Sequence, residues 1–170
     1  MHPYTEPKVE QREILLLPGP VSVEAEVLEA LSYPVRAHYG ADWAQFYRRL
    51  TGSLARIFKT ETDPLLLFGP GTAAIEACFA STLARGDEVA VVANGLFGER
   101  MVDVAAAMGV EVHLVTADDD YGPVSPDRLE DVLRRQPRVR AVGVVHHETS
   151  LGLVNPVREL CEVAGRRDVV

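Results

Sequence analysis

The chain has 170 residues, about the usual length of one domain, and 47% of them are apolar while 25% are charged. This composition is that of an ordinary globular protein and excludes an intrinsically disordered chain. The net charge of −8 excludes a general nucleic-acid binder, because that function needs a basic face.

The sequence carries no membrane or secretion signal that we recognise. No apolar run approaches the ~20 residues that cross a bilayer, and the polar start MHPYTEPKVEQREI lacks the apolar core of a signal peptide. Cys78 and Cys161 lie far apart in helical patterns, so we expect two buried free thiols. Because disulfides are rare in reducing compartments, these features predict a soluble cytoplasmic protein without membrane or nucleic-acid partners.

The first third of the chain predicts an extended arm and two helices. Residues 1–13 are expected to be extended, and the Pro-Gly-Pro turn at 18–20 stops any regular element. Ser22 is placed to cap a helix that runs to about Leu31. From Asp42, apolar residues recur at three- and four-residue steps, which predicts an amphipathic helix. These apolar residues are Trp43, Phe46, Leu50, Leu54 and Ile57.

After Pro64 the pattern alternates between strands and helices. In chain order we expect a strand at 65–68, a helix at 72–84, a strand at 89–93, a helix at 97–108, a strand at 110–115, a helix capped by Ser125 with Pro126 first, a strand at 139–145 and a helix at 156–165. This order is typical of a mainly parallel sheet with helices on its faces. The final RRDVV reads as the opening of a further strand, so we expect the N-terminal part of a longer protein.

A glycine-rich bend, GPGT, lies between the predicted strand at 65–68 and the helix that follows. Glycines let backbone N–H groups approach an anion, and a helix N-terminus adds about half a positive charge. A P-loop is excluded, because its lysine is missing. Gly69, Gly71 and Ala74 match the dinucleotide pattern, but Asn94 stands where that class needs an acid, which leaves it as an alternative.

Two more loops follow strands of the predicted sheet, and ligands of such sheets bind at that edge. ANGLFGER offers Phe97, which suits either stacking on a flat ring or the core. HHETSLGLVNP offers hydroxyl and acid side chains; its two adjacent histidines point to opposite faces of a strand, so we expect no metal. A phosphate cradle, an aromatic plate and these polar groups fit a phosphorylated aromatic ring, such as pyridoxal 5′-phosphate, better than a dinucleotide.

Five segments together resemble the class V aminotransferases of fold type I, nearest the alanine–glyoxylate and serine–pyruvate aminotransferase branch. They are LLLPGPVSV, AHYGADWAQFY, GPGTAAIEA, ANGLFGER and HHETSLGLVNP, in the family's order over nearly all of the chain after residue 13. The resemblance implies an α/β fold, with an N-terminal arm and substrate-loop segment at 1–40. Residues 41–170 are then part of the PLP-binding large domain, a mainly parallel, helix-flanked sheet.

The resemblance also implies the residues that hold pyridoxal phosphate. Gly71 and Thr72 match the positions that bind the phosphate, Phe97 matches the aromatic that stacks on the pyridine ring, and Thr149 matches the hydroxyl that bonds a ring substituent. Pro70 stands where relatives often carry serine, which removes one hydroxyl and one N–H from the phosphate cup.

Other roles implied by the resemblance concern the substrate and the catalytic groups. Gly19 and His38 lie in segments that line the substrate pocket, and Glu148 has a supporting role. No catalytic residue is assigned within this chain, because the Schiff-base lysine is expected beyond Val170. Asp168 precedes the expected place of the carboxylate that pairs with the pyridine nitrogen, so it is not assigned that role.

The function implied is amino-group transfer from a small amino acid to a 2-oxo acid such as glyoxylate or pyruvate, by a homodimer. The 170 residues alone are expected to be inactive. Three alternatives stay open: a 2-aminoethylphosphonate transaminase-like member of the same family, an NAD-type dinucleotide-binding domain, and a non-catalytic remnant that only dimerises or stabilises a partner.

Overall fold

The structure is a computed structural model that describes residues 14–119 and 122–170. The chain divides into two compact units, Met1–Leu65 and Leu66–Val170, and each is described by itself. The extended arm predicted at 1–13 lies outside the described residues. The functional boundary predicted at residue 40 stays a prediction.

The first unit contains two helices, α1 (Ala25–Leu31) and α2 (Ala41–Phe58). The amphipathic helix predicted from Asp42 is confirmed as α2. The predicted cap of α1 is wrong: Ser22 lies two residues before the cap position, which Glu24 occupies, and the Glu24 carbonyl accepts the N–H groups of Val27 and Leu28. Glu24 makes no side-chain cap, so α1 begins without one.

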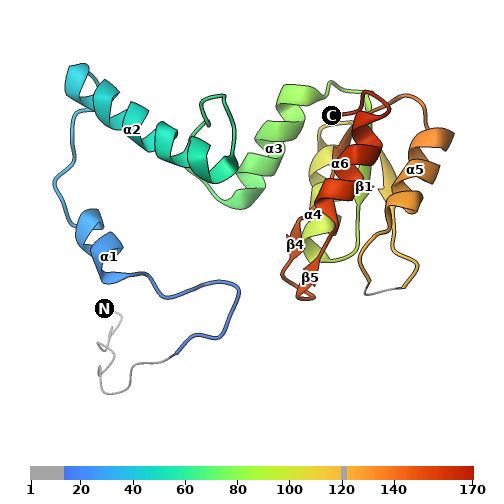
Figure 1. Cartoon of the computed structure of the whole chain (residues 1–170), viewed down its shortest axis with the longest axis horizontal. Helices are drawn as coiled ribbons and strands as arrows, with labels where there is room; N and C mark the ends of the chain where they lie inside the picture. The colour runs from blue at the N-terminus through green and yellow to red at the C-terminus, as the bar shows by residue number, and fades with distance from the viewer. Residues whose placement is uncertain (1–13, 120–121) are drawn as a thin grey trace, which may run out of the picture. The chain divides into compact units, whose positions relative to one another are not determined.

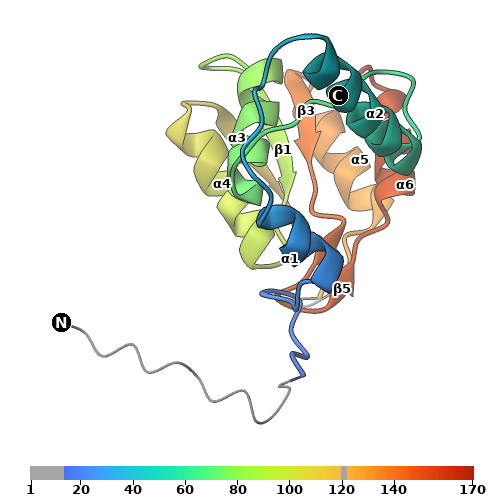
Figure 2. The same cartoon turned by 90° about the vertical axis from the view of Figure 1, so that its left-hand side faces the viewer.

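The second unit is built on a parallel sheet in the order β2-β1-β3. Its strands are β1 (Glu88–Val92), β2 (Glu111–Val115) and β3 (Val139–Gly143). Its helices are α3 (Gly71–Thr82), α4 (Leu96–Ala107), α5 (Pro126–Arg135) and α6 (Val157–Gly165). Helices α3 and α4 cover one face of the sheet, and α5 and α6 cover the other (Figures 1 and 2). This arrangement confirms the predicted α/β fold with helices on both faces.

The central strand β1 supplies both halves of the core. Val89 and Val91 pack with Phe79 of α3 and Met101 of α4, and all four side chains are buried. The alternate residues of β1 face α5 and α6 instead and pack against Leu129 and Leu160. Because successive side chains of a strand point to opposite faces, an uninterrupted apolar run suits a strand covered on both sides.

Two expectations at the margins of the sheet had different outcomes. No strand forms at 65–68, where Leu65 is 94% and Phe68 107% exposed, because none of the described strands pairs with this run. At the other end, Val170 forms two backbone hydrogen bonds with the edge of β3 that β1 leaves free. Its N–H donates to the Arg140 carbonyl at 3.1 Å, and its carbonyl accepts from Val142 at 2.7 Å. This is the bonding pattern of a parallel neighbour of β3, but only Val170 takes part in it: residues 166–168 form a turn, no strand is present at 169–170, and Val170 is 76% exposed, so the predicted buried strand is not formed within these residues.

The predicted burial of the two cysteines is wrong, since both are free and exposed. Their neighbours in sequence explain this result. In α3 the sheet-facing residue is Phe79, and in α6 it is Leu160. Because adjacent helical residues point about 100° apart, Cys78 and Cys161 turn away from the core. Among the described residues, no helix is both long enough and apolar enough to cross a membrane.

Candidate cofactor site

The site is built at the edge of the sheet where β1 and β3 end. After β1 the chain bends at Asn94 and Gly95 and enters α4, whose second residue is Phe97. After β3 it forms a short hairpin of β4 (His147–Glu148) and β5 (Leu153–Val154), which was not predicted.

The two loops are joined by one buried carboxylate and one hydroxyl. Glu148 Oε2 accepts the backbone N–H groups of Phe97 at 3.0 Å and Gly98 at 3.1 Å. Its Oε1 accepts the Ser150 hydroxyl at 2.6 Å and the Ser150 N–H at 3.2 Å. The Ser150 hydroxyl in turn accepts the Leu96 N–H at 3.2 Å. The first three N–H groups of α4, which have no acceptor within the helix, are therefore all satisfied from the hairpin.

Glu148 is fully buried, and its hydrogen bonds decide its charge. Burial raises the pKa of its carboxyl, but the donors of Ser150, Gly98 and Phe97 outweigh this effect and leave the pKa below its usual value. The side chain is therefore a carboxylate at neutral pH, and its negative charge lies at the positive end of α4.

Two glycines allow the close approach of these elements. A Cβ on Gly95 would lie 2.3 Å from Glu148 Cγ and 2.6 Å from its Cδ, so any side chain there displaces the carboxylate. A Cβ on Gly98 would lie 2.7 Å from the Val92 carbonyl oxygen, which lets α4 pack closely on the end of β1. The glycines of ANGLFGER thus have a steric role that the sequence pattern did not reveal.

A reciprocal pair of amides lies beneath this edge. Asn94 Nδ2 donates to Asn155 Oδ1 at 2.8 Å, and Asn155 Nδ2 donates back to Asn94 Oδ1 at 3.2 Å. The pair also bonds the carbonyls of Val145 and Gly122 and the N–H of Val124. Both side chains are buried, at 6% and 1% exposure. The loops that follow the strands are thereby tied to one another.

The N-terminus of α3 differs from that of α4. Pro70 occupies the cap position without any side-chain hydrogen bond, and its carbonyl accepts the Ala73 N–H at 2.9 Å. A Cβ on Gly71 would meet nothing within 4 Å, so the space beside it is open. The N–H groups of Gly71 and Thr72 remain at the positive end of a 12-residue helix, an arrangement that suits an anion.

Phe97 and Thr149 are the other two predicted cofactor residues, and both are half-buried. Each lies in one of the two joined loops: Phe97 donates its N–H to Glu148, and Thr149 lies between Glu148 and Ser150 in sequence. The Arg100 guanidinium carbon lies 5.8 Å from the centre of the Phe97 ring. The structure therefore brings these two predicted residues to one edge of the second unit.

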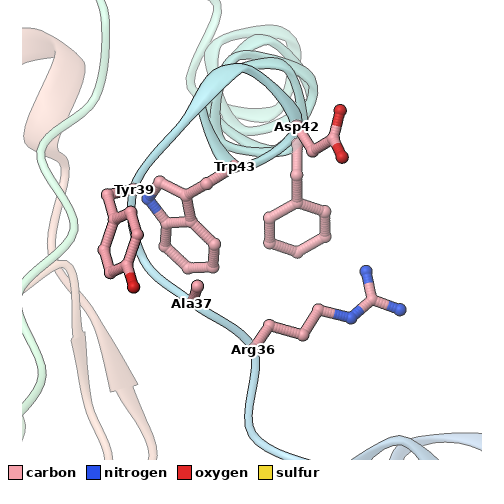
Figure 3. A pocket seen from close by; sticks show the side chains of 6 residues that line it. Arg36, Ala37, Tyr39, Asp42 and Trp43 are labelled. Atoms are coloured by element: carbon pink, nitrogen blue, oxygen red, sulfur yellow. The ribbon is translucent and has the colours of Figure 1, made fainter.

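The predicted substrate residues belong to the first unit. Gly19 and His38 are exposed, and the His38 ring packs edge-on against Tyr39 with 5.6 Å between ring centroids. Residues close to His38 in sequence line a cavity of about 360 Å³, and Figure 3 shows the Tyr39 and Trp43 rings turned toward it. Neither Gly19 nor His38 lines this cavity, and their substrate roles stay predictions.

The described residues contain no group of three or more His, Cys, Asp or Glu side chains that could hold a metal. The sequence predicted hydroxyl and acid side chains at this edge, including Ser150, but not the bonds of Ser150 to Glu148 and Leu96 or the pairing of Asn94 with Asn155. The only local signal for the pair was the position of each asparagine next to a Gly or a Pro after a strand, which is also typical of an ordinary turn.

A parallel sheet with helices on both faces, and polar loops gathered at the carboxyl ends of its strands, defines the class of α/β proteins that bind ligands at that edge. A family model, aminotransferase class V, matches residues 29–170. The chain belongs to the class V aminotransferase family.

Its relatives are longer proteins. An uncharacterized aminotransferase of Methanocaldococcus jannaschii is 34% identical over 94% of this chain and 41% of its own length. A 2-aminoethylphosphonate–pyruvate transaminase of Klebsiella pneumoniae is also 34% identical, over 91% and 42%. The crystal structure of an alanine–glyoxylate aminotransferase from Nostoc sp. superposes with a TM-score of 0.86 at 28% identity, over 98% of this chain and 44% of that one. The chain thus spans about two fifths of the length of these relatives.

Proposed function

We propose that the protein containing this chain transfers an amino group from a small amino acid to a 2-oxo acid such as glyoxylate or pyruvate, with pyridoxal 5′-phosphate as cofactor. The observation that carries the proposal is the direct bonding of the hairpin of Thr149 to the first turn of α4, which holds Phe97. Family membership supports the same reaction class.

The residues of the second unit fit the cofactor. The uncapped N-terminus of α3 offers the N–H groups of Gly71 and Thr72 and the Thr72 hydroxyl to a phosphate. The N-terminus of α4 is closed to anions, because Glu148 and Ser150 already accept its N–H groups. Of these two helices, α3 is therefore the one that would hold the phosphate.

The remaining contacts would orient the ring. Phe97 supplies an aromatic face, and Thr149 supplies a hydroxyl that donates to an oxygen on the ring. When bound, the cofactor supplies an electron sink that stabilises negative charge next to the amino group. This chain's part is to bind and orient it. The lysine and the carboxylate that the family resemblance requires are not matched in these residues, so we expect the 170 residues alone to bind but not to turn over.

The choice of substrates within the family is a finer proposal. Pyruvate is named for the relative of Klebsiella pneumoniae and glyoxylate for the structure from Nostoc sp., which supports a small 2-oxo acid as the acceptor. The donor is alanine or serine in the leading proposal and 2-aminoethylphosphonate in the alternative. A matrix of these three donors against the two acceptors, with the products separated by chromatography, distinguishes them.

Titration separates the proposal from the dinucleotide alternative. We expect pyridoxal phosphate to bind the purified protein and NAD not to bind. Thr72→Ala should weaken binding about tenfold to a hundredfold, because it removes one hydrogen bond to a charged group. Thr82→Ala is the matched control at the other end of α3, where the hydroxyl bonds the Cys78 carbonyl at 2.8 Å, and it should leave affinity unchanged. Binding of NAD without binding of pyridoxal phosphate would overturn the proposal.

A further inference from the structure

We propose that Glu148 is a positioning residue for the cofactor site: with Ser150, it fixes the loop of Thr149 to the first turn of α4 and so sets Phe97 and Thr149 relative to each other. This inference rests on the proposed function, since Phe97 and Thr149 contact a cofactor only under that proposal.

The carboxylate uses its two oxygens on two separate segments. Oε2 bonds the N–H groups of Phe97 and Gly98 in α4, and Oε1 bonds the hydroxyl and N–H of Ser150 in the hairpin. Hydrogen bonds to a charged acceptor are roughly twice as strong as neutral ones. A displacement of either segment by an ångström would therefore break charge-assisted bonds of a carboxylate that is fully buried.

The two proposed contact residues lie inside this connection. Phe97 donates its own N–H to the carboxylate, so this bond fixes the backbone that carries the Phe97 ring. Thr149 has Glu148 before it and Ser150 after it, so its backbone is held on both sides. A shift of about an ångström at a binding group can change binding or catalysis greatly. The bonds of Glu148 should therefore affect cofactor binding as well as folding.

Gly95 makes these hydrogen bonds of Glu148 sterically possible. Because its missing side chain leaves room for Cγ and Cδ of Glu148, the carboxylate can reach the first turn of α4 from a strand about fifty residues further along the chain. An ordinary cap would come from the residue just before the helix. A cap supplied by the hairpin joins the helix to the loop of Thr149, which a local cap would not do.

The test compares Glu148→Gln with Glu99→Gln in the full-length protein. Glu99 lies in the same first turn of α4 but is exposed, so both changes remove one negative charge from the same helix end. Three quantities are measured: the dissociation constant of pyridoxal phosphate, the circular dichroism of the bound cofactor, and the melting temperature without cofactor. We expect Glu148→Gln to weaken binding about tenfold and to alter the cofactor's dichroism, and Glu99→Gln to change affinity less than twofold.

Ser150→Ala covers the case in which Glu148→Gln does not fold. It removes one hydroxyl and leaves the bonds of Glu148 to Phe97 and Gly98, so we expect a smaller loss of affinity, about threefold, with the same sign of change in dichroism. If these variants lower the melting temperature but keep affinity and dichroism, Glu148 is only structural and the inference is wrong. If the unaltered protein does not bind pyridoxal phosphate, the proposed function and this inference both fail.

Discussion

Replacing Gly95 with alanine should destabilise the second unit because of one steric conflict. The φ angle of Gly95 is 170°, which is extended backbone that alanine adopts without strain. The added Cβ would lie 2.3 Å from Cγ and 2.6 Å from Cδ of Glu148, however, so the carboxylate must move. Its bonds to Phe97 and Gly98 are then lost, at about 1.5–3 kcal/mol each before relaxation. With partial relaxation we expect the free energy of unfolding to fall by about 2–4 kcal/mol.

Urea unfolding followed by far-ultraviolet circular dichroism measures this loss, and the midpoint should fall by about 1–2 M. Gly165→Ala is the matched control, because a Cβ there meets nothing within 4 Å, and it should change the unfolding free energy by less than about 1 kcal/mol. In a Glu148→Ala background the conflict is absent, so Gly95→Ala should then cost little. An equal cost in both backgrounds would refute the steric explanation.

Three further predictions follow from the geometry of the second unit. The pKa of the Glu148 carboxyl is lowered in the folded protein, so the ionised carboxylate stabilises the fold at pH values above the ordinary pKa of a glutamate. This stabilisation is lost as the pH falls through the pKa that Glu148 has in the folded state. Between pH 6 and pH 3 the urea midpoint should therefore fall more in the unaltered protein than in Glu148→Gln. Asn155→Ala leaves the buried Asn94 amide without its partner and should lower the unfolding free energy by about 1–3 kcal/mol in the same assay, whereas no loss would show that water replaces the pair. Cys78 and Cys161 are exposed, so both should react with a thiol reagent in the native protein as fast as in urea; slow native labelling would mean that another surface covers them.

The two helix N-termini of the proposed site have different tasks for a physical reason. A helix start has free N–H groups and a positive end, and it can bind either an internal carboxylate or an external anion, but not both. Glu148 occupies that position at α4, while Pro70 leaves the start of α3 without a side-chain cap. Under the proposed function, the lack of a side-chain donor at Pro70 leaves the N–H groups of Gly71 and Thr72 and the Thr72 hydroxyl as the donors for the phosphate.

Local signals in the sequence determined the order and kind of most elements. The apolar run of β1 predicted a strand covered on both faces, and the Ser125-Pro126 start predicted where α5 begins. Periodicity also predicted α2. These signals are reliable because each depends on residues within one or two turns of the chain. The five quoted motifs likewise predicted the family, because their order and spacing can be read directly from the sequence.

Tertiary structure alone decided what holds the proposed site together. The bonds of Glu148 to Phe97 and of Asn94 to Asn155 join residues 51 and 61 positions apart. The local periodicity of apolar and polar residues cannot predict contacts over such distances in the sequence. The apolar run at 65–68 shows the same limit, because a strand forms only where another strand completes its hydrogen bonds. Residue types thus fixed which groups are available at this edge, and long-range packing fixed which of them are occupied and which stay free for a ligand.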